Sequence, residues 1–123
     1  MGAMRLAAAR IFVSDLSPAI GFYTTLLGPP TAVDPGGTYA VFNANTADIV
    51  VETVPEDAPP DDLALVGRFT GISFAVDDLD DAYERLQASG LRFSGEPEIQ
   101  AWGGRLATVV DPGGNELQLV QYT

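Results

Sequence analysis

A chain of 123 residues with 46% apolar side chains can form one hydrophobic core, but it is too short for two separate globular domains. Six basic and 17 acidic residues give a net charge of −11, which disfavours nucleic-acid and membrane partners because it repels phosphates and anionic lipids. The sequence contains no cysteine, which excludes disulfides, thiolate catalysis and sulfur-ligated zinc. No apolar run approaches the roughly 20 residues that span a bilayer. Residues 1–10 lack the apolar segment of a signal peptide, so we expect a soluble, cytoplasmic protein.

The first predicted elements recur 63 residues later in the chain. Residues 11–19 align without gaps with residues 74–82, and the identical pairs are Val13 and Val76, Asp15 and Asp78, Leu16 and Leu79, and Ala19 and Ala82. Apolar residues alternate with other residues at the start of each copy, a period of two that is typical of a strand. Residues 1–3 precede a second methionine, Met4, as a vector-derived start would, so we place the domain at residues 4–123.

A helix is predicted after each of these strands. Ser17 is a good N-cap with Pro18 at the first helical position, and Asp80 is the equivalent cap in the second copy. Gly28 and Gly90 mark the two helix ends. Helically spaced apolar residues form a stripe in each helix: Ile20, Tyr23, Leu26 and Leu27, then Ala82, Tyr83 and Leu86. Both helices should therefore lie on a sheet.

Strand-like runs follow each helix. They cover residues 39–42 and 49–54 in the first copy, and residues 106–110 and 116–121 in the second. Hairpin turns are predicted at residues 43–47 and 111–115, the latter because proline fixes φ and glycine accepts a positive φ.

The organisation that results is βαβββ, twice, within one domain. The first module covers about residues 4–54, a linker about 55–67, and the second module about 68–123. The linker assignment depends on residues 55–62, which are too polar and proline-rich to form core.

Several segments carry a resemblance to a known family. Val13-Ser14-Asp15-Leu16, Phe22-Tyr23 and Leu26-Leu27-Gly28 resemble the opening of a vicinal oxygen chelate protein, the superfamily of glyoxalases, bleomycin-resistance proteins and extradiol dioxygenases. The segment from Trp102-Gly103-Gly104-Arg105 through Asp111-Pro112-Gly113-Gly114-Asn115 to Leu117-Gln118-Leu119-Val120-Gln121 resembles its last two strands. The resemblance implies an α+β fold, with a curved mixed sheet around a cleft and helices on the outer face. It also implies a homodimer, which often completes the cleft.

Catalytic members of this superfamily hold a divalent metal through a histidine on the first strand of each module and a carboxylate on the last. Carried over, the histidine positions fall near Ala8 and Gly71, and this chain has no histidine at all. The second carboxylate position falls at Gln118, and the first at Glu52 or, without a gap, at Val51. A single carboxylate cannot surround Mg²⁺ or Ca²⁺, so we expect no catalytic metal and no cofactor. A solvent-facing Glu52 is the simpler alternative.

The remaining cleft is expected to bind a small molecule. The predicted ligand-binding residues are Arg10, Phe12, Tyr39, Glu52, Ser73, Trp102 and Gln118. Arg10 would contact either an anionic ligand group or, as an internal pair, Glu52. Trp102 would close over a flat ligand, or it would pack between the modules or across a dimer contact.

Three functions fit these residues. The first is a metal-independent binding protein that sequesters an aromatic or cationic natural product, as the superfamily's antibiotic-resistance members do. The second is a glyoxalase-like lyase, isomerase or dioxygenase with an atypical metal site, in which Glu52 is the general base. The third is a regulatory or scaffold domain whose cleft is filled by its own side chains. The acidity of the chain would attract a cationic ligand, or it would only maintain solubility.

Overall fold

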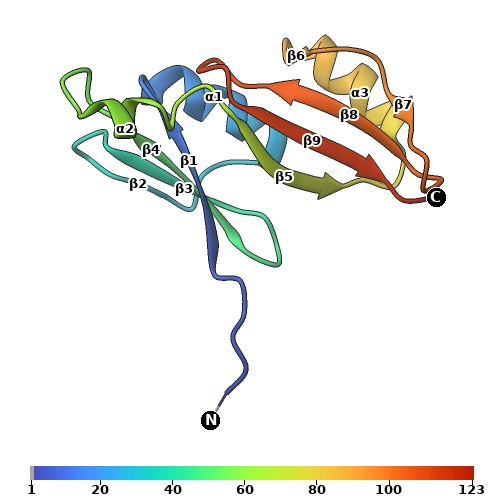
Figure 1. Cartoon of the computed structure of the whole chain (residues 1–123), viewed down its shortest axis with the longest axis horizontal. Helices are drawn as coiled ribbons and strands as arrows, with labels where there is room; N and C mark the ends of the chain where they lie inside the picture. Colours follow the sequence, from blue (N-terminus) through green and yellow to red (C-terminus); the bar gives the residue numbers. More distant parts are fainter. Residues whose placement is uncertain (1) are drawn as a thin grey trace. The chain divides into compact units, whose positions relative to one another are not determined.

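The computed structural model describes residues 2–123 and divides the chain into two compact units, one ending at Val66 and one spanning Gly67–Thr123 (Figure 1). We call these units module one and module two and describe each by itself. Each has its own mixed sheet and a long helix, which confirms the α+β class and the repeated βαβββ plan. No helix within residues 2–123 is long and apolar enough to cross a membrane.

Module one contains a four-stranded sheet in the order β1-β4-β3-β2. Its elements are β1 (Ala8–Val13), α1 (Leu16–Leu27), β2 (Ala32–Val33), β3 (Tyr39–Asn43), β4 (Asp48–Thr53) and the short helix α2 (Pro60–Leu63). Strand β1 runs parallel to β4, while the pairs β4-β3 and β3-β2 are antiparallel. The predicted turn at residues 43–47 joins β3 to β4, where the Ala44 N–H donates to the Ala47 carbonyl.

Module two contains a five-stranded sheet in the order β5-β9-β8-β6, with β7 also paired to β8. Its elements are β5 (Phe69–Ala75), α3 (Leu79–Ala88), β6 (Arg92–Phe93), β7 (Glu98–Ile99), β8 (Arg105–Val110) and β9 (Glu116–Gln121). Strand β5 runs parallel to β9, as β1 does to β4. The sequence pattern did not locate β2 and β6, which have two residues each, and β7 is an addition to the βαβββ plan.

Both predicted N-caps were wrong by two residues. Helix α1 begins after Asp15, whose Oδ1 accepts a hydrogen bond from the Ser17 N–H, so Ser17 lies inside the helix. Helix α3 begins after Asp78, whose Oδ1 accepts from the Asp81 N–H. Aspartate is as good a cap as serine. Asp15 and Asp78 both have the extended backbone conformation that an N-cap residue requires. The true caps are the pair of aspartates that the repeat aligns.

The predicted helix ends also differ in one module. Gly28 is the C-cap of α1, as predicted, with φ of 95°. Helix α3 ends at Ala88 with Ser89 as its C-cap, so Gly90, also at φ 95°, follows the cap. Both glycines have a positive φ, which residues with a side chain rarely adopt. This backbone conformation ends the helical path at each glycine.

Alternation along the strands decides which face of each sheet is covered by its helix. In module one, Ile11, Val13, Ile49 and Val51 are buried on the side of α1, where Tyr23 is fully buried and its ring centroid lies 5.9 Å from that of Phe42. In module two, Leu117 and Leu119 are buried on the side of α3. The residues between them in sequence point to the other side. We call that side the open face of each sheet.

Candidate ligand-binding surfaces

Four of the predicted residues lie together on the open face of module one. Strand register places Glu52 of β4 directly between Phe12 of β1 and Tyr39 of β3. Arg10 lies one open-face position before Phe12 on β1. Residues 42 positions apart in sequence therefore meet because β4 is inserted between β1 and β3.

Arg10 forms the internal pair with Glu52. Its Nε lies 2.6 Å from Glu52 Oε1 and its second guanidinium nitrogen 2.8 Å from Oε2, a bidentate geometry that suits the planar guanidinium. The guanidinium carbon also lies 5.2 Å from the centre of the Phe12 ring, within cation–π range. The hydrogen bond from Arg10 and its positive charge hold the pKa of Glu52 below its ordinary value, although partial burial opposes this shift.

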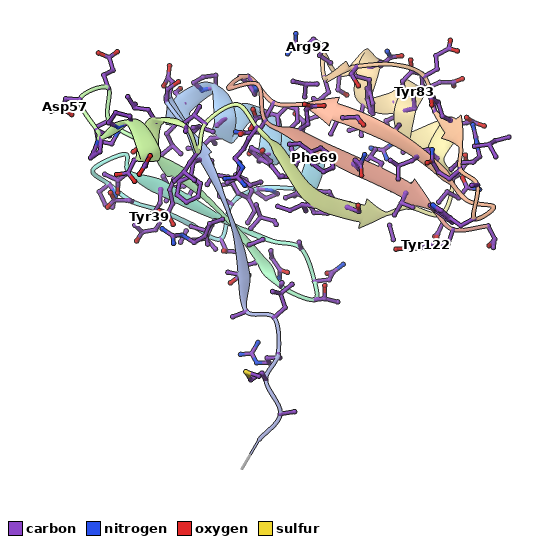
Figure 2. The ribbon with its side chains drawn as sticks, in the orientation of Figure 1. Tyr39, Asp57, Phe69, Tyr83, Arg92 and Tyr122 are labelled. Carbon is purple, nitrogen blue, oxygen red and sulfur yellow. The ribbon has the colours of Figure 1, made fainter. Side chains whose placement is uncertain are left out.

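A hollow of about 410 Å³ adjoins this pair on the same face. Its lining residues are Thr38, Tyr39, Val41, Val50, Glu52 and Thr53. Tyr39 is 40% exposed (Figure 2), so its ring is available to a ligand. The hollow thus combines an aromatic ring, two valines and the Glu52 carboxylate, the usual composition of a small-molecule site.

Two of the predicted residues of module two, Ser73 and Gln118, also lie on its open face. Ser73 of β5 pairs with Gln118 of β9, so the two side chains are neighbours. Gln118 and Thr108 line a hollow of about 260 Å³ beneath the segment that carries Glu96, Glu98 and Gln100. Val120, which shares this face by register, is buried instead of lining the surface.

Trp102 lies in the tight turn that leads into β8. The Gly103 N–H donates to the Gln100 carbonyl, and the Gln100 N–H donates to the Gly104 carbonyl. The indole is 55% exposed, and its ring lies 5.8 Å from that of Tyr122, which follows β9 and is 64% exposed (Figure 2). Sequence reasoning missed Tyr122. The alternation along β9 offered the signal, since it places Tyr122 on the same face as Gln118 and Val120.

The structure revises the comparison of the carboxylate positions. Ser73 pairs with Gln118 and its repeat partner Arg10 pairs with Val50, so the counterpart of Gln118 is Val50 and neither Glu52 nor Val51. Val51 is fully buried on the helix side of the sheet. Counting residues across the turn failed because register is set by strand pairing. Within residues 2–123, no three carboxylates are grouped so that they could hold a metal ion.

The backbone at Gly71 also differs from that of an ordinary strand. Gly71 has φ of 74°, within an irregular stretch between the Phe69–Glu116 and Ser73–Gln118 pairs. The Thr70 hydroxyl donates to the Glu116 carbonyl and accepts from the Ile72 N–H, which holds this bulge. A histidine side chain at position 71 would be strained, because only glycine adopts this conformation readily.

Known proteins share the sequence and fold of this chain. The profile of the Glyoxalase/Bleomycin resistance protein/Dioxygenase superfamily matches residues 5–119. The chain belongs to this superfamily. A superfamily member from Sphaerobacter thermophilus is 31% identical, with a TM-score of 0.75 and coverage of 97% of this chain and 98% of that one. TnmS3, an antibiotic binding protein from Streptomyces sp. CB03234, is 28% identical, with a TM-score of 0.77 and coverage of 100% and 99%.

Two further similarities are more limited. A bleomycin resistance protein from Klebsiella pneumoniae is 36% identical over a match that covers 37% of this chain and 42% of that protein. Lactoylglutathione lyase from Agrobacterium tumefaciens is 17% identical, with a TM-score of 0.75 and coverage of 98% and 95%, and this likeness concerns the fold alone. By its description, the superfamily whose profile matches includes glyoxalases and dioxygenases as well as bleomycin resistance proteins.

The Arg10–Glu52 pair should make stability depend on pH below the ordinary pKa of a glutamate. Because the pKa of Glu52 is lower in the folded chain than its ordinary value of 4.5, the pair contributes fully above that value. Its contribution is lost as the pH falls through the folded pKa. The stability difference between the wild type and Glu52→Gln should thus be constant near neutral pH and shrink below about pH 4.5. Urea unfolding followed by circular dichroism measures this difference, and an equal difference at about pH 3 and pH 7 would contradict it.

Proposed function

We propose that the chain binds an aromatic or cationic natural product on the open faces of its sheets, without a metal, and leaves the molecule unchanged. The observation that carries this proposal is the cluster of Arg10, Phe12, Tyr39 and Glu52, of which Tyr39 and Glu52 line the 410 Å³ hollow. The similarity to TnmS3, an antibiotic binding protein that is 28% identical over the whole chain, supports it. The name of the Klebsiella pneumoniae relative supports it for part of the chain.

The cluster suggests how such a ligand would be held. A planar ring would stack on Tyr39 or Phe12, whose π faces also attract a positive charge. A cationic group would compete with Arg10 for the Glu52 carboxylate, and the net charge of −11 would favour its approach. In module two, Trp102 and Tyr122 offer a second pair of rings for an aromatic ligand, and Ser73 and Gln118 offer neutral hydrogen-bonding groups.

The enzymatic alternative gains less from the same geometry. A general base works best when its pKa lies near the working pH, which for a glutamate requires a raised value. Arg10 shifts the pKa of Glu52 in the opposite direction and occupies both carboxylate oxygens. The Glu52 carboxylate is therefore better suited to binding a cation than to accepting a proton.

We also propose that the chain forms a homodimer. Tyr39 in module one, and Phe69, Trp102 and Tyr122 in module two, are large apolar side chains that are 40–64% exposed. Contiguous exposed apolar groups mark interaction surfaces, and the rings of Trp102 and Tyr122 are contiguous. A second copy would shield these rings from water and add walls to an open hollow.

A ligand titration tests the proposed function. The probes are bleomycin and ethidium, a planar aromatic cation, and anilinonaphthalene sulfonate serves as a planar aromatic anion. Binding of a cationic probe should quench Trp102 or raise the melting temperature, with about 2.7 kcal/mol of stabilisation at one hundred times its Kd. Tyr39→Ala should weaken binding about tenfold, while the ring-preserving Tyr39→Phe should restore it.

Other results of that titration would count against the proposal. Equal binding of the anionic probe, or no effect of Tyr39→Ala, would contradict a cationic aromatic ligand on the open face. Turnover of the bound compound, followed by mass spectrometry, would contradict simple sequestration. Sedimentation of the same samples with and without probe should give a two-chain mass, and a one-chain mass throughout would contradict the homodimer.

A further inference from the structure

A second hollow of module one, about 660 Å³, lies where the N-terminus of α1 meets the start of β3 and the end of β4. Ile20, Val33 and Pro55 contribute its apolar wall, while Asp15 and Glu56 contribute carboxylates. No lysine or arginine is among its lining residues. This hollow shares Thr38 and Thr53 with the one beside Tyr39, but it needs neither Tyr39 nor the Arg10–Glu52 pair.

The internal repeat identifies the same place in module two. Phe12 pairs with Glu52 and its repeat partner Ala75 pairs with Val120, so the next residues, Thr53 and Gln121, are counterparts. Arg105 is the strand neighbour of Gln121. In the same way, Thr38 is the neighbour of Thr53, because the Thr53 N–H donates to the Thr38 carbonyl. Arg105 is therefore the counterpart of Thr38. On the helices, the 63-residue repeat matches Asp80 with Ser17 and Tyr83 with Ile20.

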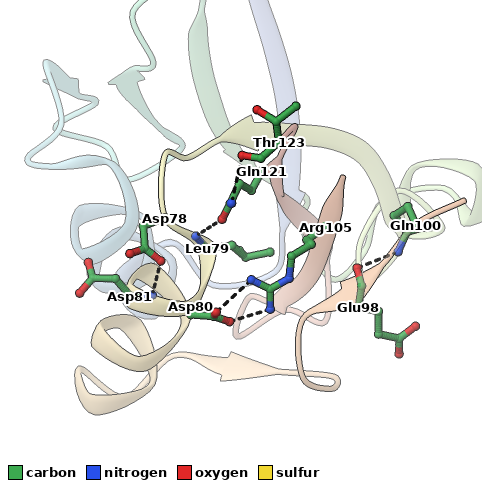
Figure 3. Close-up of polar contacts among 9 residues, drawn as sticks. All are labelled: Asp78, Leu79, Asp80, Asp81, Glu98, Gln100, Arg105, Gln121 and Thr123. Carbon is green, nitrogen blue, oxygen red and sulfur yellow. Dashed lines mark hydrogen bonds and ion pairs between the residues drawn. The ribbon is translucent and has the colours of Figure 1, made fainter. Parts of the chain in front are cut away.

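Module two fills this place with its own side chains (Figure 3). The Arg105 guanidinium makes two hydrogen bonds to the Asp80 carboxylate, at 2.7 and 3.0 Å. Gln121 Oε1 accepts a hydrogen bond from the Leu79 N–H at 2.8 Å, at the start of α3. Together these contacts join the first turn of the helix to β8 and β9.

Module one has shorter side chains at all four counterpart positions. On the helix, Ser17 and Ile20 take the places of Asp80 and Tyr83. On the strands, Thr38 and Thr53 take the places of Arg105 and Gln121. The Thr53 hydroxyl donates to the Thr38 carbonyl at 3.3 Å. The hollow exists because these residues are too short to fill it.

The charge that remains in the hollow is negative. In module two, Asp78 acts with Asp80 to raise the pKa of Arg105. Its repeat partner Asp15 lines the hollow of module one, where a guanidinium is missing among the lining residues and Glu56 adds a second carboxylate. A helix N-terminus carries about half a positive charge, which favours anions. The two carboxylates of the hollow outweigh that charge. Module two shows that a cation can lie at such a helix start, because Arg105 is bound by Asp80 in the first turn of α3.

We propose that this hollow is a second binding site, which takes a guanidinium or primary ammonium group carried on a short apolar stem. The cationic group would lie by Asp15 and Glu56, in the place that Arg105 has in module two. The stem would lie against Ile20, Val33 and Pro55.

The test uses butylguanidinium on the full chain, with butylurea as the neutral molecule of the same shape. Chemical shifts of the Ser17 and Thr38 amides should move with butylguanidinium and not with butylurea at physiological salt. Asp15→Asn keeps a good N-cap, and it should weaken binding about fivefold. Ser17→Asp combined with Thr38→Arg should rebuild the bridge of module two, fill the hollow and abolish binding.

Each contrary result would overturn this inference. Equal shifts with butylurea would show that the charge is irrelevant, and shifts with inorganic phosphate alone would show an anion site. Retained binding in the double variant would place the cation elsewhere. If Tyr39→Ala weakened butylguanidinium binding as much as Asp15→Asn, the cation would lie on the open face. The second site would then be refuted while the proposed function stood.

Discussion

Replacing Asn115 by alanine should lower the free energy of unfolding by about 3 kcal/mol, because it leaves several buried polar groups without partners. Asn115 is fully buried beside Asp111. Its Oδ1 accepts hydrogen bonds from the N–H groups of Gly67 and Arg68, and its Nδ2 donates to Asp111 Oδ2 at 3.0 Å. Asp111 Oδ1 in turn accepts from the N–H groups of Gly113 and Asn115, which fixes the turn between β8 and β9.

Asn43 offers a matched control for this change. It also lies at a hairpin turn, where its Oδ1 accepts from the Asn45 N–H at 2.7 Å, but it is exposed, so water can replace the lost bond. Asn43→Ala should therefore cost about 1 kcal/mol or less. Urea unfolding followed by circular dichroism reports both modules, so it covers Asn115 in module two and Asn43 in module one. Equal losses in the two variants would show that burial of the Asn115 network contributes nothing.

Gly104→Ala should displace the Trp102 indole and destabilise module two by about 1–3 kcal/mol. A Cβ at position 104 would overlap the Trp102 ring, and it would lie 2.7 Å from the carbonyl oxygen of Gln121. The half-exposed indole can swing away, but the Gln121 carbonyl belongs to β9 and must shift with its strand. We expect a red-shifted Trp102 emission together with a lower urea midpoint.

Gly95→Ala is the control for this variant. No heavy atom lies within 4 Å of a Cβ built at position 95, so the methyl group meets open space. The emission and the midpoint should then remain close to those of the wild type. An unchanged emission spectrum in Gly104→Ala would mean that the ring does not lie over Gly104 in solution. In that case Trp102 and Tyr122 would not act as a fixed pair for a ligand.

Much of the fold could be predicted because short-range rules determined it. Alternation along β1 predicted that Ile11 and Val13 are buried and that Arg10 and Phe12 are not. The Asp111–Asn115 turn was predictable from its proline and glycines. The strands of two residues, β2, β6 and β7, escaped detection because two residues contain no period.

Less of the candidate sites could be predicted, because the residues that form them are brought together by pairing between distant strands. Arg10 and Glu52 were recognised as possible partners, and the parallel pairing of β1 and β4 places them in contact. The hollow at Thr38 and Thr53 was missed. Its existence depends on what those side chains fail to fill, and short hydroxyl residues give no signal in a single sequence. The short side chains of Thr38 and Thr53 indicate a hollow only when they are compared with Arg105 and Gln121, their longer counterparts in module two.

The bulge at Gly71 bears on how this chain could change over evolutionary time. Between Phe69 and Ser73 the strand β5 advances four residues, while its partner β9 advances two, from Glu116 to Gln118. Straightening the strand would therefore require a deletion of two residues, and Thr70 would lose both hydrogen bonds that it makes there. Deletions inside strands are tolerated far less often than substitutions, since a change of register alters which side chains face the core. With the bulge in place, a point mutation of Gly71 to a larger residue would leave a strained backbone, so an unstrained side chain at this position needs the deletion as well.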